Sequence, residues 1–392
     1  MTPPGVMLDE RQRFEWLRLA RTEGVGPRTF QDLINRFGGA AAALEALPML
    51  ARARGRPVRI PEPSEIEMEL RRAERMGARF IALGESAYPE RLRLIDGPPP
   101  LLAVYGRIEA LHGPIVGIVG ARNSSAPGRK IASLLAGGLA EAGFGVASGL
   151  ARGIDTEAHR ASLKQGTIAV LAGGLDKPYP PENAGLMQEI AGHGAVISEM
   201  PFGLSPRGQD FPRRNRLIAG VSLGVIVVEA ARRSGSLITA RLANEQGREV
   251  FAVPGSPLDP RHEGTNDLLR DGATLITSAE DVIAVLRPLA GEADRAPRLF
   301  REPQRAEDDP LFEEWADEAA PESSLYDAGP GDEASLPPEM RVMQLLSYTP
   351  IEVDTLARML EMEPRTLNAL LVELEMSGAI TRHGGNRVAR MA

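Results

Sequence analysis

The sequence contains no cysteine. This absence excludes disulfide bonds, thiolate metal sites and a cysteine nucleophile, and it agrees with the reducing conditions of the cytoplasm. No uninterrupted apolar run reaches the roughly 18 residues that a membrane span needs. The first residues, MTPPGVMLDERQRFEW, include acids and no apolar signal core, so no secretion signal is expected. We therefore expect a cytoplasmic protein without a membrane span.

Aromatic side chains and histidines are also scarce. Phe, Trp and Tyr together make up 4% of the 392 residues, so an aromatic residue beside a cluster of cations is informative. The chain has five histidines, and they form no cluster at the spacing of metal ligands. The sequence therefore predicts neither a metal site nor a bound cofactor.

The net charge of −8 argues at first against a nucleic-acid partner. The charge is unevenly distributed, because residues 291–333 contain 14 acids and 4 arginines. The remainder of the chain therefore has a net charge of about +2. A segment this acidic, with few aromatics and several prolines and glycines, is typical of a disordered linker.

Four regions follow from composition and hydrophobic periodicity. Residues 1–75 contain amphipathic helices joined by GVGP and resemble a SAM-like or helix-hairpin-helix domain, although a plain packing unit has the same pattern. Residues 76–287 form the central domain, and residues 288–335 the acidic linker. Residues 336–392 predict two helices and a hairpin at HGGN, which is the pattern of a winged-helix domain.

The central region alternates short apolar runs with helical patterns. The expected strands are RFIAL, PIVGIV, FGVAS, TIAVL, GAVIS, LGVIVV and VFAVP, and the expected helices span 128–142, 155–165, 182–192, 238–247 and 279–287. Strands that are apolar on both faces and separated by helices indicate a parallel sheet covered on both sides. The fold class is therefore α/β, with a Rossmann-like, doubly wound, mostly parallel sheet whose ligands bind beyond the carboxyl ends of the strands.

The first glycine-rich turn, GIVGARNSSAPGRK, precedes a helix. Backbone N–H groups after Gly120, together with Arg122 and Ser124, favour a phosphate-binding turn over a purely structural one. A dinucleotide site requires the pattern G-x-G-x-x-G here and an acid at the end of the next strand. Both are missing, since Ser148 and Gly149 stand at that strand end.

The second turn, SGLARGIDTEAH, also leads into a helix. Asp155 or Thr156 can cap that helix. His159 lies four residues after Asp155, on the same helical face, and is interpreted as a packed histidine rather than as a metal ligand.

Two further stretches combine cations with aromatic residues. AGGLDKPYPPEN brings Lys177 and Tyr179 to a strand end, where lysine can meet a phosphate and tyrosine can stack on a base. QDFPRRNRLIAG places Phe211 before Arg213, Arg214 and Arg216, near an expected helix start, which suits an unpaired polynucleotide. Alternatively, Arg214 or Arg216 pairs with Glu199 or Glu229, and at least one arginine is expected to be structural in this way.

Nucleophilic catalysis has little support in the sequence. The turn VVEAARRSGSLITA is friendly to anions, but none of its serines has a recognisable base partner. Glu229 is the best single candidate for a catalytic acid or base, and it could equally cap a helix or pair with a cation.

These motifs together resemble the DNA-processing protein A family (DprA, also called Smf). The stretches that carry the resemblance appear in order between residues 78 and 287: YPERLRLIDGPPPLLAVYG, GARNSS, SGLARGIDTEAHRASL, GGLDKPYPPEN, SEMPFG, FPRRNRLIAG, VVEAARRSGSLITA and VFAVPG. The terminal regions are similar to the SAM-like and winged-helix domains that some members carry.

The resemblance implies a function that spacing alone cannot show. It implies a non-catalytic protein that binds single-stranded DNA, displaces single-strand-binding protein and loads RecA onto incoming strands during natural transformation. It also implies a homodimer formed through the Rossmann-like domain. With the first turn included, the candidate DNA contacts are Gly120, Arg122, Ser124, Ser148, Gly149, Lys177, Phe211, Arg213, Arg214 and Arg216.

One alternative is an enzyme, because the fold also resembles nucleotide phosphoribohydrolases. SGSLITA departs from the Gly-Gly-x-Gly-Thr loop of those enzymes. The winged helix is a doubtful reader of duplex DNA, since its second helix has Glu363, Glu373 and Glu375 against one Arg365. We therefore interpret that domain as a protein-contact or regulatory element.

Overall fold

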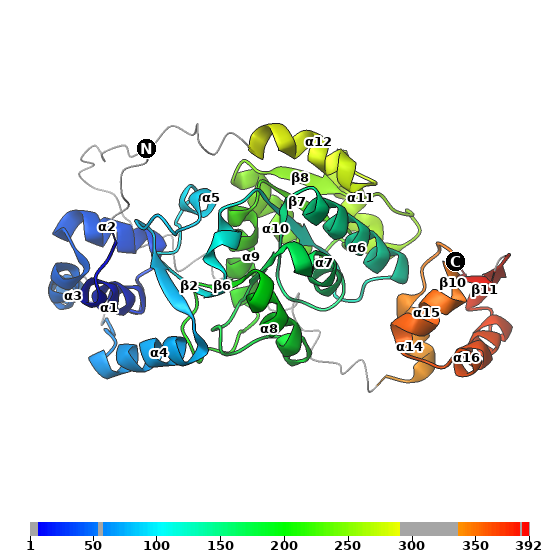
Figure 1. Ribbon diagram of the computed structural model, residues 1–392, viewed down its shortest axis with the longest axis horizontal. Helices are drawn as coiled ribbons and strands as arrows, with labels where there is room; N and C mark the ends of the chain where they lie inside the picture. The colour runs from blue at the N-terminus through cyan, green and yellow to red at the C-terminus, as the bar shows by residue number, and fades with distance from the viewer. Residues whose placement is uncertain (1–6, 54–57, 291–335, 385, 392) are drawn as a thin grey trace.

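The computed structural model describes residues 7–53, 58–290, 336–384 and 386–391 (Figure 1). The acidic linker predicted for 288–335 lies outside the described residues from position 291 onwards. The preceding helix, α12 (Ala279–Ala290), continues through Pro288 into the range predicted as linker. Among the described residues, no helix is both long enough and apolar enough to cross a membrane.

The N-terminal region is helical, as predicted. It consists of α1 (Glu10–Ala20), α2 (Pro27–Phe37), α3 (Ala40–Ala53) and α4 (Pro63–Met76). Asp9 begins α1 with a capping box, in which its carboxylate accepts from the backbone of Gln12 while the Gln12 side chain accepts from the backbone of Asp9. Phe30 and Leu33 of α2 pack with Leu19 of α1 to form a small separate core.

The central domain contains a sheet with the strand order β1-β2-β6-β5-β4-β3-β7-β8-β9. Every neighbouring pair from β6 to β9 is parallel, whereas β2 pairs antiparallel with both β1 and β6. The strands are β1 (Arg79–Ala82), β2 (Leu101–Gly106), β3 (Ile115–Val119), β4 (Gly145–Ser148), β5 (Thr167–Val170), β6 (Ala195–Ser198), β7 (Gly224–Val227), β8 (Glu249–Ala252) and β9 (Thr274–Leu275). The doubly wound, mostly parallel sheet predicted from the sequence is confirmed, with the direction of winding reversing between β3 and β7.

Helices cover both faces of this sheet, because its central strands are buried on both sides. One face carries α5 (Glu90–Arg93), α9 (Asp210–Val221) and α10 (Gly235–Glu245). The other carries α6 (Ala126–Glu141), α7 (Ile154–Ser162), α8 (Ala184–His193) and α12. Helix α11 (Glu263–Arg270) and the short 3-10 helices Ile108–Leu111, Leu163–Gln165, Pro181–Asn183 and Pro260–His262 complete the domain.

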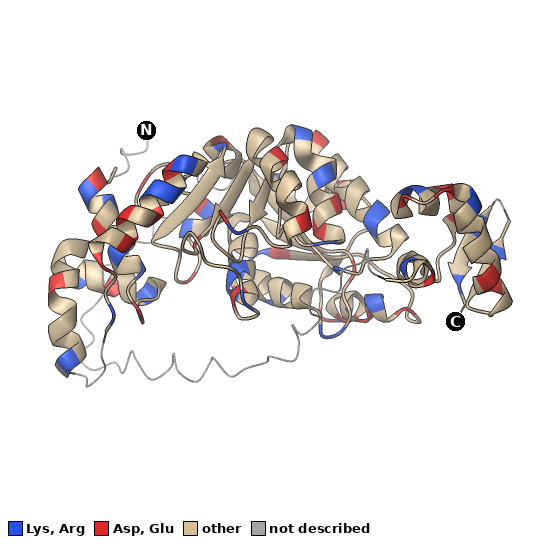
Figure 2. Ribbon diagram, turned by 90° about the horizontal axis from the view of Figure 1, so that it is seen from below, with Lys and Arg blue, Asp and Glu red and all other residues tan. Residues whose placement is uncertain are grey.

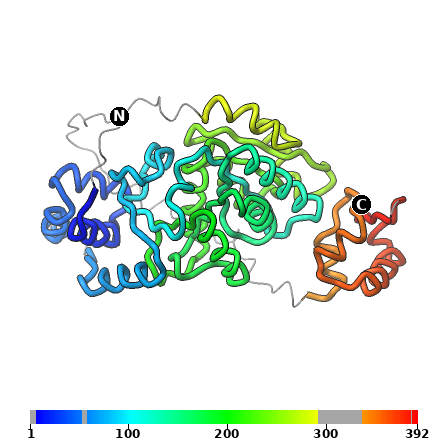
Figure 3. The backbone as a smooth tube through the Cα atoms, viewed as in Figure 1, coloured from blue at the N-terminus to red at the C-terminus, as the bar shows by residue number. Residues whose placement is uncertain are grey.

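The C-terminal region is a winged helix, as predicted. It contains α14 (Pro338–Leu345), β10 (Ile351–Glu352), α15 (Val353–Leu360), α16 (Pro364–Met376), β11 (Ile380–His383) and β12 (Arg387–Arg390). Leu356, Leu367 and Val388 are fully buried in its own core. The N-terminal helices and the winged helix lie at opposite ends of the central domain (Figures 1 and 3).

Candidate nucleic-acid interface

The loops after β3, β4, β5 and β6 lie side by side at one edge of the sheet, because these strands are parallel neighbours. Arg122 follows β3, Lys177 and Tyr179 follow β5, and Phe211 stands at the start of α9 after β6. The expectation that the glycine-rich turns share one edge is therefore met by the strand order. Figure 2 shows Lys and Arg mixed with Asp and Glu throughout the described chain. Burial and pairing, rather than overall charge, must therefore distinguish the cations of this edge.

Phe211 is the meeting point of three loops. Its ring centroid lies 5.6 Å from that of Tyr179 in an edge-to-face arrangement. The guanidinium carbon of Arg122 lies 5.0 Å from the centre of the Phe211 ring, and that of Arg214 lies 5.9 Å away. Both distances are within the range of a cation–π interaction. Residues from distant parts of the chain thus form one cluster of two aromatic rings and two cations, which we call the Phe211 cluster.

Arg122, a member of this cluster, and Lys177, two residues before Tyr179, are both exposed cations. Within the described part of the chain, neither residue forms an ion pair with a carboxylate. Arg213 is also exposed, with 51% of its side chain accessible, but its Nε lies 3.0 Å from Glu199. The surface is therefore cationic, and Glu199 neutralises part of it.

The arginines after Phe211 occupy three different environments. Helix α9 begins at Asp210, earlier than predicted, so the arginines lie within its first turns rather than before it. Arg214 is only 6% exposed and donates to the carbonyls of Gly149 and Val170, each at 2.6 Å. Arg216 is half-buried, donates to the carbonyl of Gly97 at 2.9 Å, and pairs with Glu199. The predicted pairing of at least one arginine with Glu199 is thus confirmed, and Arg213 is the most exposed of the three.

The turn after β4 is fixed by buried contacts of its own residues. Ser148 is fully buried, and its hydroxyl donates to the carbonyl of Ile118 at 2.6 Å. A side chain on Gly149 would overlap the Arg214 guanidinium, so glycine is needed for this close approach. As placed here, Ser148 and Gly149 shape the turn and are not exposed for contact with a strand.

Asp155 organises the same turn rather than capping the next helix as predicted. Gly153 begins α7 without a side-chain cap, whereas the Asp155 carboxylate accepts from the backbone N–H groups of Gly149 (3.0 Å) and Ala151 (3.3 Å). Burial raises the pKa of Asp155, and the nearby Arg214 and the backbone donors oppose this effect.

His159 is a packed histidine, as interpreted from the sequence. It is fully buried, and its Nδ1 lies 2.8 Å from the hydroxyl of Thr167. Burial, reinforced by the charge of Arg214, lowers its pKa to about 3, so the ring is neutral in the folded protein. Among the described residues, no three His, Asp or Glu side chains are grouped to hold a metal ion.

The turn after β3 has one outward-facing and two inward-facing residues among those predicted to bind DNA. Arg122 is exposed. A side chain on Gly120 would collide with Ile154, so this glycine permits close packing of α7. Ser124 is 1% exposed, and its hydroxyl accepts from Nε of Arg129 at 3.2 Å. Gly120 and Ser124 therefore set the course of the loop that presents Arg122.

The start of α6, predicted to be a phosphate site, is occupied by the carboxylate of Glu229. Glu229 follows β7 and is fully buried at the point where the winding direction reverses. It accepts from the backbone N–H of Ser125 at 2.9 Å and from the Ser125 hydroxyl. Gly128 leaves room for it, since any side chain there would overlap the carboxylate. Burial raises the pKa of Glu229, while the Ser125 donors and the nearby His262 and Arg261 lower it.

This arrangement corrects the expected phosphate site, and it decides between the roles left open for Glu229 in favour of a helix cap. The positive end of α6 does not offer an open anion site, because the protein's own carboxylate fills it. Glu229 is also not placed as a catalytic acid or base, because it has no exposed surface. A phosphate bound at the start of α6 would meet a carboxylate, so the nucleotide-hydrolysing alternative is not favoured.

Sequence reasoning missed a set of residues at the junction with the winged helix. Arg129 of α6 faces Arg341 and Gln344 of α14 across a cavity beside the β3–α6 loop. No local signal could have revealed this, because the facing residues are more than two hundred positions apart and separated by the acidic segment.

Comparisons with known proteins agree with this architecture. The family described as DNA recombination-mediator protein A matches residues 79–287. A DprA-like N-terminal HHH domain matches residues 10–72, and a DprA winged helix domain matches residues 327–386.

Individual relatives cover most of the chain. Protein Smf of Synechocystis is 32% identical over 96% of this chain and 98% of its own length. The X-ray structure of DNA processing protein A from Streptococcus pneumoniae matches with a TM-score of 0.60 and 32% identity, covering 71% of this chain and 98% of that one. A structure of DNA processing protein A from Helicobacter pylori, described in terms of its single-stranded DNA binding mode, matches with a TM-score of 0.50 and 31% identity, covering 54% and 97%. With all three of its domains matched in order, the chain belongs to the DNA recombination-mediator protein A family, known as DprA or Smf.

Proposed function

We propose that this protein binds single-stranded DNA across the loops after β3, β5 and β6 and acts as a recombination mediator. The observation that carries the proposal is the Phe211 cluster, in which Arg122, Tyr179 and Phe211 meet beside the exposed Lys177. Cations alternating with aromatic rings suit an unpaired strand, whose phosphates and base faces are both accessible. The single-stranded DNA binding described for the Helicobacter pylori relative supports the same reading.

The residues divide into those that touch the strand and those that hold the surface in shape. We assign phosphate contacts to Arg122, Lys177 and Arg213, and base stacking to the aromatic rings of Tyr179 and Phe211. Each stacked base contributes about 1–3 kcal/mol to binding without strong sequence preference. The remaining candidates act from beneath: Gly120, Ser124, Ser148, Gly149, Arg214 and Arg216.

The partners follow from the family description rather than from a contact in the structure. A recombination mediator delivers single strands to a recombinase, so we propose that the bound strand is passed to RecA after displacement of single-strand-binding protein. We further propose that the chain works in the cytoplasm, as a homodimer through its central domain, on strands taken up in natural transformation. RecA filament formation on an oligonucleotide coated with single-strand-binding protein should be accelerated by the full chain and not by a variant defective in DNA binding.

Binding of the full chain to oligo(dT) as a function of salt tests the interface. Arg122→Ala and Lys177→Ala should each weaken binding and make the log–log salt slope shallower by about 0.7, because each removes one phosphate contact from a single strand. Arg241→Ala is the matched control, since Arg241 is an exposed arginine on α10, 72% accessible and paired with its helix neighbour Glu245. Its slope should equal that of the wild type.

Two results would contradict the proposal. One is an unchanged salt slope in both Arg122→Ala and Lys177→Ala. The other is release of free base and ribose phosphate from a mononucleotide, which would restore the enzyme alternative. We expect no such release, because Glu229 occupies the start of α6.

A further inference from the structure

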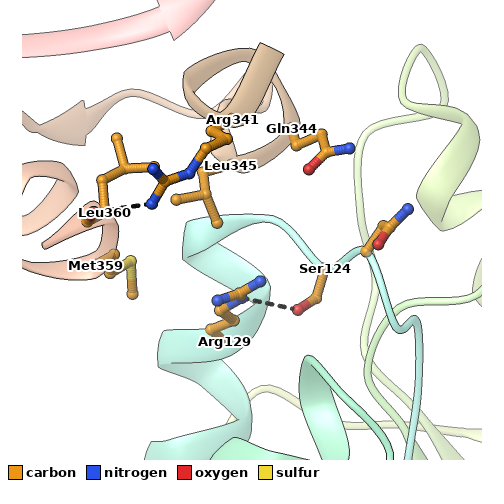
Figure 4. A pocket seen from close by; sticks show the side chains of 8 residues that line it. Ser124, Arg129, Arg341, Gln344, Leu345, Met359 and Leu360 are labelled. Carbon is orange, nitrogen blue, oxygen red and sulfur yellow. Dashed lines mark hydrogen bonds between the residues drawn. The ribbon is translucent and has the colours of Figure 1, made fainter. Parts of the chain in front are cut away.

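A cavity of about 240 Å³ lies between the central domain and the winged helix (Figure 4). The central domain contributes the β3–α6 loop and the first turns of α6, and the winged helix contributes α14 and the end of α15. Its polar lining consists of Asn123, Ser124, Arg129, Arg341 and Gln344. The cavity is therefore shared by two domains that are far apart in sequence.

Two guanidinium groups line this cavity from opposite sides. Arg129 donates from Nε to the hydroxyl of Ser124 at 3.2 Å, and Arg341 donates to the carbonyl of Leu360 at 3.1 Å. Across the described ranges, neither arginine forms an ion pair with a carboxylate. Two acids of the adjoining loops of the central domain are already engaged, Glu229 by Ser125 and Asp259 by Arg261.

The winged helix is fastened to the central domain next to this cavity. Arg261 is held by Asp259 through a two-pronged contact, Nε to Oδ1 at 3.0 Å and a terminal nitrogen to Oδ2 at 2.8 Å. The same guanidinium donates to the carbonyls of Gln344 (3.1 Å) and Leu346 (2.9 Å), which lie at the C-terminal end of α14. A cation there satisfies unpaired carbonyls and the negative end of the helix dipole. Ala126, at the start of α6, packs into the core of the winged helix.

Two unneutralised guanidinium groups facing one cavity repel each other and favour an anion between them. Arginine suits phosphate because its planar donors match two phosphate oxygens at once. Such an anion would join the domains, since one arginine belongs to each. Ligand binding and docking of the winged helix are therefore coupled by charge.

We propose that this cavity binds a backbone phosphate of the single strand that crosses Arg122, so that DNA strengthens the docking of the winged helix that Arg261 and Ala126 already provide. Asn123 and Ser124 line the cavity and directly follow Arg122, so the strand needs only to continue along the same loop. This inference rests on the proposed function. It gives the winged helix a role in holding the strand that does not require its acidic α16 to read duplex DNA.

Salt-dependent binding to oligo(dT) by the full chain tests the cavity. Arg341→Gln should weaken binding by about tenfold or more, the value of one charge-assisted contact, and make the salt slope shallower by about 0.7. Arg129→Gln, on the opposite wall, should have the same effect even if Arg341→Gln disturbs the winged helix itself. Arg358→Gln is the matched control, because Arg358 is an exposed arginine of α15 that also donates to a backbone carbonyl, that of Asp354.

Domain closure gives a second, independent measurement. Because the chain has no cysteine, Glu141→Cys and Met376→Cys can carry a fluorescent donor and acceptor on exposed sites of α6 and α16. Oligo(dT) should raise energy transfer between the dyes, and Arg341→Gln should abolish the rise. Inorganic phosphate and thymidine triphosphate serve as the competing sources of the same phosphate chemistry, and neither should produce closure at concentrations comparable to the oligonucleotide.

The outcomes separate this inference from the function on which it rests. Salt slopes for Arg341→Gln and Arg129→Gln equal to that of Arg358→Gln would overturn this inference. Weaker binding by Arg122→Ala and Lys177→Ala would in that case still support the proposed function. Closure by inorganic phosphate as effective as closure by oligo(dT) would overturn the assignment to a DNA strand. Loss of the Arg122 and Lys177 effects would instead refute the proposed function itself.

Discussion

Two places along the same edge of the sheet can be compared: the switch between β3 and β7, where α6 starts and which we call the crevice, and the surface over β3 to β6. Both are bordered by glycine-rich turns that lead into helices. In the crevice, Glu229 accepts the donors of Ser125 at the start of α6. On the surface, Arg122 lies over Phe211 and Lys177 is exposed. The start of α6 thus holds the protein's own carboxylate, whereas no carboxylate pairs with Arg122 or Lys177 among the described residues.

The contrast shows that a helix start or an arginine cluster is an anion site only where the protein's own carboxylates are directed elsewhere. Glu229 closes the crevice, and Glu199 pairs with Arg213 and Arg216. These internal pairings leave the outer loops as the cationic part of the edge. Under the proposed function, this surface rather than the start of α6 binds the polymer.

Opening the closed crevice is the strongest way to break this comparison. Glu229→Ala removes the buried carboxylate that accepts from Ser125 and lies 3.7 Å from His262, and it should lower the free energy of unfolding by about 3 kcal/mol. It also exposes the positive end of α6. Millimolar inorganic phosphate should therefore raise the thermal midpoint of the variant more than that of the wild type.

Thermal unfolding with and without phosphate measures both effects. Glu245→Ala is the control, since Glu245 is an exposed acid of α10 with 58% of its side chain accessible. An equal phosphate response in wild type and Glu229→Ala would mean that the carboxylate does not seal the site, and the contrast between crevice and surface would fail.

Adjacent arginines of α9 sharpen the comparison at the next level of effect. Arg214→Ala leaves the buried carbonyls of Gly149 and Val170 without their donor and should cost about 2 kcal/mol of stability. Arg213→Ala removes an exposed guanidinium from Glu199, which keeps its pair with Arg216, and should change stability by about 0.5 kcal/mol or less. Denaturant unfolding of the two variants provides the measurement. Equal losses of stability would contradict the assignment of Arg214 to structure and Arg213 to the surface.

The sheet and its helices were largely predictable because apolar runs and helical periodicity are local signals. All seven predicted strands are present, and the turns that follow them lie along one edge, as the parallel topology requires. Strand β2 was missed, since LLAVYG follows a run of prolines and pairs antiparallel outside the repeating pattern.

Burial within the site was not predictable, because it depends on partners far away in the sequence. Arg214 reaches a carbonyl 65 positions distant, and Glu229 reaches a serine 104 positions distant. The local sequence of an arginine cluster does not indicate whether one arginine is buried or all are exposed. For this reason the sequence could nominate Arg213, Arg214 and Arg216 together but could not rank them.

The smallest predicted effect concerns the pH dependence of the layer beneath the surface. His159 has a folded-state pKa of about 3 because burial and Arg214 disfavour its charged form. In the unfolded chain its pKa is about 6.5, so only the unfolded state takes up a proton between these values. Stability from this residue is therefore complete above pH 6.5 and is lost as pH falls towards 3. The loss from pH 6 to pH 5 should be about 1 kcal/mol.

Comparison of unfolding free energies at pH 6 and pH 5 isolates this contribution. His159→Gln should lose less stability over that interval than the wild type, because its side chain cannot take up a proton in either state. His193→Gln is the control, since His193 is exposed on α8 and its ring is hydrogen-bonded to the carbonyl of Glu189. Taking the difference between wild type and variant cancels the opposite contribution of Asp155, whose raised pKa stabilises the fold as pH falls. If His159→Gln and wild type lost equal stability, the proton uptake on unfolding would occur at another residue. The lowered pKa assigned to His159 would then be wrong.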